Sequence, residues 1–98
     1  MNLTTFNESL KNSAPPNTSV YLKALWYDAK DNWKASHKLI DHLEDKKACW
    51  VHAYLHRKEG DLWNADYWYS KADRRRPTIS LQEEWEDLLD AFIDEPSF

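Results

Sequence analysis

The sequence contains one glycine and one cysteine among its 98 residues. A single cysteine excludes an internal disulfide framework and is typical of proteins from a reducing compartment. No run approaches eighteen apolar residues, so we expect no membrane-spanning helix and no membrane partner. Residues 1–17 lack the basic start and apolar core of a secretory signal, so we expect none. Together these absences favour a cytoplasmic location.

An excess of positive charge is also missing, since the formal net charge is −4. This balance argues against non-specific nucleic-acid binding, which needs a basic surface, and we expect no nucleic-acid partner. The one basic run, at residues 74–76, follows the end of a predicted helix, where cations complement the helix dipole. A site for phosphate or for an acidic partner is the alternative interpretation of this run.

Recognisable catalytic motifs are missing as well. The chain shows no Ser/His/Asp order, no glycine-rich phosphate loop and no paired catalytic carboxylates. Cys49 occupies a position that is usually apolar in such a helix, so we expect a buried thiol, with a reactive thiol as the alternative. The sequence therefore favours a protein without enzymatic activity of its own and without a cofactor.

Aromatic residues are abundant, with six tryptophans and five tyrosines. Each can bury about 150–250 Å², so even a small core can be adequate. The near-absence of glycine, with abundant Ala, Leu, Lys and Glu, favours helix over sheet. We therefore predict one all-α domain, in keeping with the chain length.

The centre of the chain predicts a helical hairpin. Gly60 stands where one helix must stop, and Asp61 follows as a good N-cap for the next helix. Ala65 and Ala72 lie on one face of that second helix, where small side chains allow close packing. Pro77 then prevents the helix from continuing. The two predicted helices span residues 46–59 and 61–73.

The order and spacing of these residues resemble the tetratricopeptide repeat (TPR), and the run from Ala65 to Ala72 also resembles the related Sel1-type repeat. The segment from residue 24 to 72 further resembles a group of small bacterial proteins that carries no known activity. The resemblance implies antiparallel helical hairpins. The matching positions are Ala53, Gly60, Leu62, Ala65, Tyr69, Ala72 and Pro77.

An internal repeat supports two such hairpins. A shift of thirty residues places Leu25 on Leu55 and Asp31 on Asp61, so the chain just before the hairpin is a degenerate copy of it. We therefore predict two degenerate TPR-like repeats within a domain of residues 18–95. Residues 1–17 form a polar N-terminal segment with a short helix over about 4–11.

A C-terminal capping helix is predicted after Ser80, which forms a capping box with Glu83. Its apolar stripe is expected to cover the helix over 61–73, because two repeats alone cannot bury a continuous core. The acidic residues of this helix are expected on its solvent-facing side, with an acidic binding site as the alternative interpretation. They are Glu83, Glu84, Glu86, Asp87, Asp90 and Asp94.

In proteins of the TPR type the first helices of the hairpins line a concave groove. The aromatic and basic side chains at the corresponding positions are of types that anchor interfaces. Arg57 and Lys58 suit a carboxylate of the partner. The alternative for Trp50 and Tyr54 is that they pack in the core. Tyr54 also replaces the asparagine that the family uses to bind a peptide carboxylate. The candidate groove residues are Tyr27, Asp28, Trp50, Tyr54, Arg57 and Lys58.

Two histidines break the apolar pattern of the repeat. The thirty-residue shift places His52 on Leu22 and His56 on Trp26. One interpretation is a pair of core histidines whose nitrogens find protein partners. The other is a pocket, or a metal site completed by a carboxylate or a third histidine. Glu59, His37 and His42 are the candidates for that additional ligand, and no metal is assigned from the sequence.

The sequence therefore predicts a protein-interaction module that binds a protein or peptide partner through an aromatic and basic groove. The alternative is a small-molecule or metal-binding protein, or an enzyme, that uses His52 and His56. The helix over 61–73 carries more aromatic side chains than one face can bury, namely Trp63, Tyr67, Trp68 and Tyr69. An exposed remainder would mark a partner surface, and a homodimer is the simplest partner.

Overall fold

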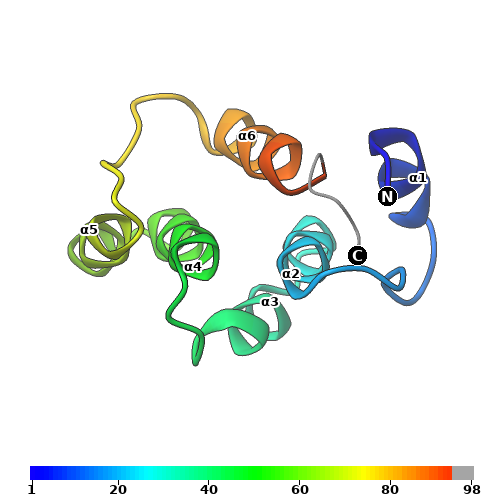
Figure 1. The fold of residues 1–98 in the computed structure, drawn as a ribbon, viewed down its shortest axis with the longest axis horizontal. Helices are drawn as coiled ribbons and strands as arrows, with labels where there is room; N and C mark the ends of the chain where they lie inside the picture. Colours follow the sequence, from blue (N-terminus) through cyan, green and yellow to red (C-terminus); the bar gives the residue numbers. More distant parts are fainter. Residues whose placement is uncertain (94–98) are drawn as a thin grey trace.

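Residues 1–93 are the part of the chain that the computed structural model describes, and they form six α-helices and no strand. The all-α prediction is confirmed. Figure 1 shows α5, α4, α3 and α2 side by side, with α6 above and α1 at one end. The helices are α1 (Leu3–Ser9), α2 (Val20–Ala29), α3 (Trp33–Ile40), α4 (Lys46–Lys58), α5 (Leu62–Lys71) and α6 (Leu81–Ile93).

Side-chain caps set where each helix begins. The predicted capping box of α6 is confirmed: the Ser80 hydroxyl accepts from the Glu83 amide at 3.1 Å, and the Glu83 carboxylate accepts from the Ser80 amide at 3.2 Å. Such contacts satisfy amides that have no partner within the helix. In α1 to α5 the N-cap side chain accepts from an amide of the first turn, and these caps are Asn2, Ser19, Asn32, Asp45 and Asp61.

The predicted chain reversal between α4 and α5 is confirmed. Gly60 has a φ of 86°, in the left-handed region that glycine adopts without strain. Ala53 and Ala65 are fully buried where the two helices pack, and Ala72 is 6% exposed. Helices α2 and α3 pack as a similar pair, in which the Ser36 hydroxyl donates to the Ala24 carbonyl at 2.7 Å.

Helices α1 and α5 end two residues earlier than predicted, and α4 ends one residue earlier, at Lys58. Helix α5 ends at Lys71, because Asp73 adopts a left-handed conformation with a φ of 58°. The Arg74 amide then donates to the Tyr69 carbonyl at 2.9 Å, which satisfies a carbonyl at the helix end. Helix α1 ends at Ser9, whose hydroxyl donates to the Phe6 carbonyl of its own last turn.

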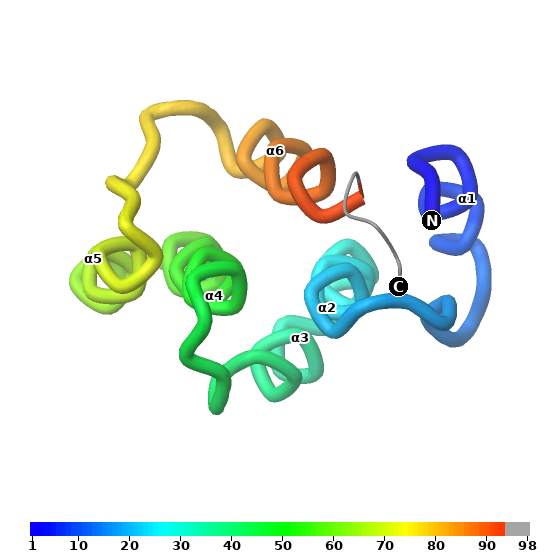
Figure 2. Tube along the Cα trace, in the orientation of Figure 1, coloured from blue at the N-terminus to red at the C-terminus, as the bar shows by residue number. Residues whose placement is uncertain are grey.

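The placement predicted for the C-terminal helix is wrong. Helix α6 packs against α2 and α4, and not along α5 as its stripe was expected to do. Figure 2 shows the connection after α5, in yellow, rising so that α6 lies over α4 and α2. The Trp85 indole donates to the Leu25 carbonyl of α2 at 3.3 Å. Helix α5 already packs against α4, and the apolar stripe of α6 is buried where α6 meets α2 and α4.

One acidic residue of α6 was also misplaced. Glu84 was predicted on the solvent-facing side, yet it is only 1% exposed. It points towards α4 because three polar side chains of α4 and α5 donate to its carboxylate. Glu83, Glu86, Asp87 and Asp90 are exposed as predicted, whereas Asp94 lies outside the described residues.

Helix α1 joins the same core. Phe6 is fully buried, and its ring lies 6.1 Å from that of Trp85. The Trp26 indole of α2 donates to the Ser9 carbonyl at 3.1 Å.

None of the helices in residues 1–93 has both the length and the apolar character that a membrane span requires.

Candidate functional site

The residues predicted to line a groove lie on α2 and α4. Four of them donate hydrogen bonds to two buried carboxylates, those of Asp28 and Glu84. Asp28 of α2 is 2% exposed, and Glu84 of α6 is 1% exposed. Tyr27 is half-buried and packs edge-on against Trp26, with ring centroids 5.2 Å apart. The other predicted groove residues divide between the two carboxylates.

Glu84 is bound from three directions. Trp50 donates to it at 3.2 Å, the Arg57 guanidinium at 2.9 Å, and the Tyr69 hydroxyl lies 2.6 Å from one oxygen and 2.7 Å from the other. Arg57 also donates to the Ile79 carbonyl, just before α6. Burial and the Glu84 carboxylate raise the pKa of Tyr69, which keeps its hydroxyl a donor. A buried carboxylate is stable only when it is paired in this way.

Asp28 holds the second group. The Tyr54 hydroxyl donates to it at 2.8 Å and the Lys58 ammonium at 2.9 Å. Burial, followed by the Asp28 charge, raises the pKa of Tyr54. These three side chains form one wall of a cavity of about 650 Å³ that lies among α1, α2, α4 and α6. Arg57 and Lys58 thus each bind a carboxylate, but one that belongs to the same chain.

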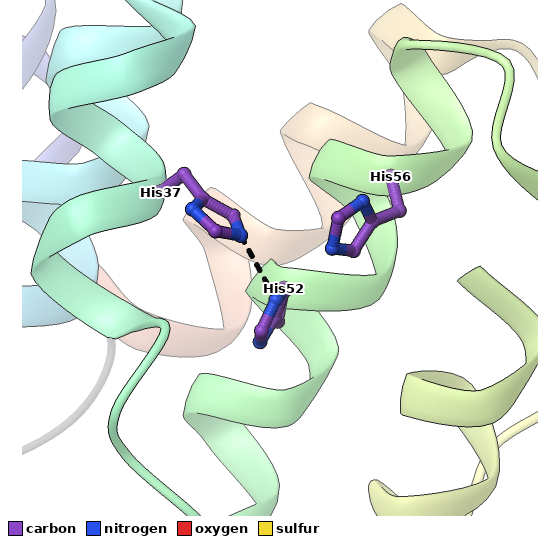
Figure 3. Close-up of side chains that lie close together, drawn as sticks. All are labelled: His37, His52 and His56. Atoms are coloured by element: carbon purple, nitrogen blue, oxygen red, sulfur yellow. Dashed lines mark hydrogen bonds between the residues drawn. The ribbon is translucent and has the colours of Figure 1, made fainter. Parts of the chain in front are cut away.

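The second candidate site is a cluster of three histidines (Figure 3). His37 projects from α3, while His52 and His56 project from α4, one turn apart. The Nε2 atoms of His37 and His52 lie 3.0 Å apart, within hydrogen-bonding distance. One ring nitrogen from each of the three residues lies within 4.8 Å of the others. We call this group the histidine cluster.

The structure separates the candidate third ligands. His37 belongs to the histidine cluster, whereas the side chain of His42 is 71% exposed in the loop after α3. Glu59 contacts His56 from outside the cluster, at 2.6 Å from its Nδ1. All three residues were candidates from the sequence. The packing of α3 against α4 decides that His37, and not His42 or Glu59, lies beside His52.

Two tryptophans hold the imidazole rings in place. The Trp68 ring stacks on His52 with centroids 4.0 Å apart, and the Trp33 ring stacks on His37 at 4.7 Å. The Trp33 indole donates to the Leu55 carbonyl at 2.8 Å, which ties α3 to α4. Neither ring contact was predicted from the sequence, although Trp33 lies one turn before His37 on the same helix.

The nitrogens of the cluster are unequally satisfied. His56 contacts Glu59, and the Nδ1 of His37 lies 3.7 Å from the Asp41 carboxylate. The Nδ1 of His52, by contrast, is buried without a hydrogen-bond partner. Burial, reinforced by the two neighbouring imidazoles, lowers the pKa of His52 to about 4. Burial and the adjacent His56 also lower the pKa of His37, so both rings are neutral at pH 7.

Comparison of the chain with protein-family models, with curated proteins and with solved structures found no match. The structure therefore offers two candidate sites. The first consists of α6, which lies across α2 and α4 and is anchored by the buried carboxylate of Glu84. The second consists of three imidazoles that pack against aromatic rings.

Proposed function

We propose that the protein is an interaction module whose α2/α4 surface binds an amphipathic helix, with α6 as the resident occupant. One observation carries the proposal: Trp50 and Arg57, both expected in a binding groove, donate to Glu84 of a helix that lies across α2 and α4. We also infer that the two hairpins are of the TPR type. The pairing of α2 with α3 and of α4 with α5 supports this inference.

The buried face of α6 indicates what kind of helix the surface accepts. A carboxylate is followed by apolar side chains at helical spacing, all of them nearly inaccessible to solvent. This pattern is typical of helix-in-groove recognition, in which side chains one turn apart anchor the helix. The anchors of α6 are Glu84, Trp85, Leu88, Leu89 and Phe92. We expect a protein partner to present a similar acidic and apolar stripe.

A peptide competition experiment tests this proposal. A fluorescent peptide of residues 80–93 should bind poorly to the wild-type protein, because α6 occupies the surface. Phe92→Ala removes a ring that packs 5.9 Å from Trp50, and it should loosen α6 enough to admit the peptide. Fluorescence anisotropy measures binding, and circular dichroism verifies that the variant is helical.

Two further variants locate the binding surface. Adding Arg57→Ala to the Phe92→Ala protein should weaken peptide binding at least about tenfold, because a charge-assisted hydrogen bond is lost. Arg76→Ala is the matched control, since Arg76 pairs with Asp66 on the surface. A helical Phe92→Ala protein that does not bind the peptide, or equal binding after both arginine changes, contradicts the proposal.

The outer face of α5 is a second candidate interaction surface, which we propose pairs with a second copy of the chain. Trp63 is 81% exposed, and Leu62 and Tyr67 are each about half exposed. Such exposed apolar side chains usually mark a partner surface. Sedimentation at tens of micromolar should show a dimer that Trp63→Ser dissociates. A wild-type protein that sediments only as a monomer contradicts the pairing.

A further inference from the structure

We propose that His37, His52 and His56 form a binding site for a divalent transition-metal ion of the zinc class. The inference is independent of the helix-binding surface, because none of the three residues contributes to the contacts of Glu84 or Asp28. The spacing of the ring nitrogens and the carboxylates beside two of the rings support it.

The donor spacing is close to what a metal requires. With zinc–nitrogen bonds of about 2.0–2.1 Å, a tetrahedral site separates its ligand nitrogens by about 3.3 Å. The Nε2 atoms of His37 and His52 are 3.0 Å apart, and a nitrogen of His56 lies within 4.8 Å of both ligand atoms. A tetrahedral site therefore requires the His56 nitrogen to move closer to the other two. Three imidazoles leave one coordination position for water.

The groups behind two of the imidazoles match those found around metal ligands. A ligating histidine usually contacts a carboxylate with its other ring nitrogen, which orients the ring. His56 contacts Glu59 at 2.6 Å through Nδ1, and His37 faces Asp41 at 3.7 Å through Nδ1. In both residues Nε2 is left for the cluster. This arrangement requires two carboxylates, one just after the end of α3 and one just after the end of α4, so it is more specific than the spacing of His52 and His56 alone.

The cluster is not a fully satisfied packing arrangement. His52 is 4% exposed, shares its Nε2 with His37, and has no partner for its Nδ1. Within residues 1–93 it provides the one buried side-chain nitrogen or oxygen without a hydrogen bond. Buried polar atoms without partners are uncommon and often mark the site of a water or an ion. The unpartnered atom is not the Nε2 that would bind the ion, so a metal ion would replace the His37–His52 hydrogen bond and leave Nδ1 as it is.

The surroundings favour a borderline transition metal over calcium or magnesium. Imidazole nitrogen suits zinc and its neighbours, whereas hard cations require oxygen ligands. Trp33 and Trp68 fix the planes of two rings, and the His37 side chain, 24% exposed, leaves a path for the ion.

Isothermal titration of the tag-free, chelator-treated protein with zinc chloride tests the site. We expect one zinc ion per chain with a micromolar or tighter Kd. His37→Gln should weaken binding at least about a hundredfold, and Glu59→Gln by about 10–100-fold because it removes the backing carboxylate. His42→Gln is the matched control, because His42 is the one histidine outside the cluster. It should bind zinc as the wild type does.

Thermal unfolding provides a second measurement that does not depend on heats of binding. Zinc at a hundredfold excess over Kd should raise the unfolding midpoint of the wild type and of His42→Gln by roughly 10–20 °C. His37→Gln should show no shift, and magnesium should give none in any variant. Three results overturn the proposal: no binding to the wild type at about 100 µM zinc, unchanged binding in a folded Glu59→Gln or His37→Gln protein, or loss of binding in His42→Gln.

Discussion

Replacing Glu84 with alanine tests how α6 is held in place. The Glu84 side chain is 2% exposed and has Trp50, Arg57 and the Tyr69 hydroxyl as its donors. Removing the carboxylate takes away the acceptor of Trp50 and Tyr69 and leaves Arg57 with the Ile79 carbonyl alone. The Arg57 guanidinium is the most costly of them, because its side chain is only 15% exposed.

The expected loss of stability follows from these contacts. Removing one partner of a buried ion pair costs about 3–5 kcal/mol, because the remaining charge is uncompensated. Arg57 still donates to the Ile79 carbonyl, so we expect the lower end, about 3 kcal/mol. A domain of this size is stable by about 5–15 kcal/mol, and its unfolding midpoint shifts by about 4–8 °C per kcal/mol. Glu84→Ala should therefore lower the midpoint by about 12–24 °C.

Urea denaturation followed by tryptophan fluorescence measures the free energy of unfolding directly. Asp87→Ala is the matched control, because it makes the same charge change at an exposed position of the same helix, and we expect an effect within about 0.5 kcal/mol. Glu84→Gln retains an acceptor oxygen and should lie between the two variants. Equal destabilisation by Glu84→Ala and Asp87→Ala would refute the conclusion that the buried carboxylate anchors α6.

Three other predictions address the turn, the histidine cluster and the cysteine. Gly60→Ala should lower the free energy of unfolding by about 1–2 kcal/mol, because Gly60 has a φ of 86°. The new Cβ meets no atom within 4 Å, so the whole loss comes from backbone strain. An unchanged denaturation midpoint contradicts this prediction. The pKa of His52 is about 4 in the folded protein and about 6.5 in the unfolded chain, so the unfolded state binds more protons between these two pH values. The free energy of unfolding should therefore fall by at most about 3 kcal/mol as the pH drops from 6.5 to 4. His52→Phe, measured beside the wild type with chelator present, should flatten that slope, and parallel profiles would contradict the assignment. Cys49 is fully buried and burial raises the pKa of its thiol, so it should react with a disulfide reagent only after denaturation; rapid reaction in the native protein would show otherwise.

The local structure of this protein was predictable from its sequence because it depends on neighbouring residues. The capping box of Ser80 and Glu83 involves atoms within one turn, and the reversal at Gly60 depends on the conformation of that residue alone. The pairing of α4 with α5 follows from the short turn and from the buried side chains of Ala53 and Ala65. These features require no knowledge of distant segments.

The partners of α6 and of His52 were decided only by the tertiary structure. A helical apolar stripe predicts that one face is buried, but it does not predict which helix covers that face. The placement of α6 on α2 and α4 could therefore not be derived from the periodicity of its sequence. The burial of Glu84 follows from that placement, because its donors come from α4 and α5. Likewise His37 meets His52 only because α3 crosses α4, and sequence separation carries no information about that crossing.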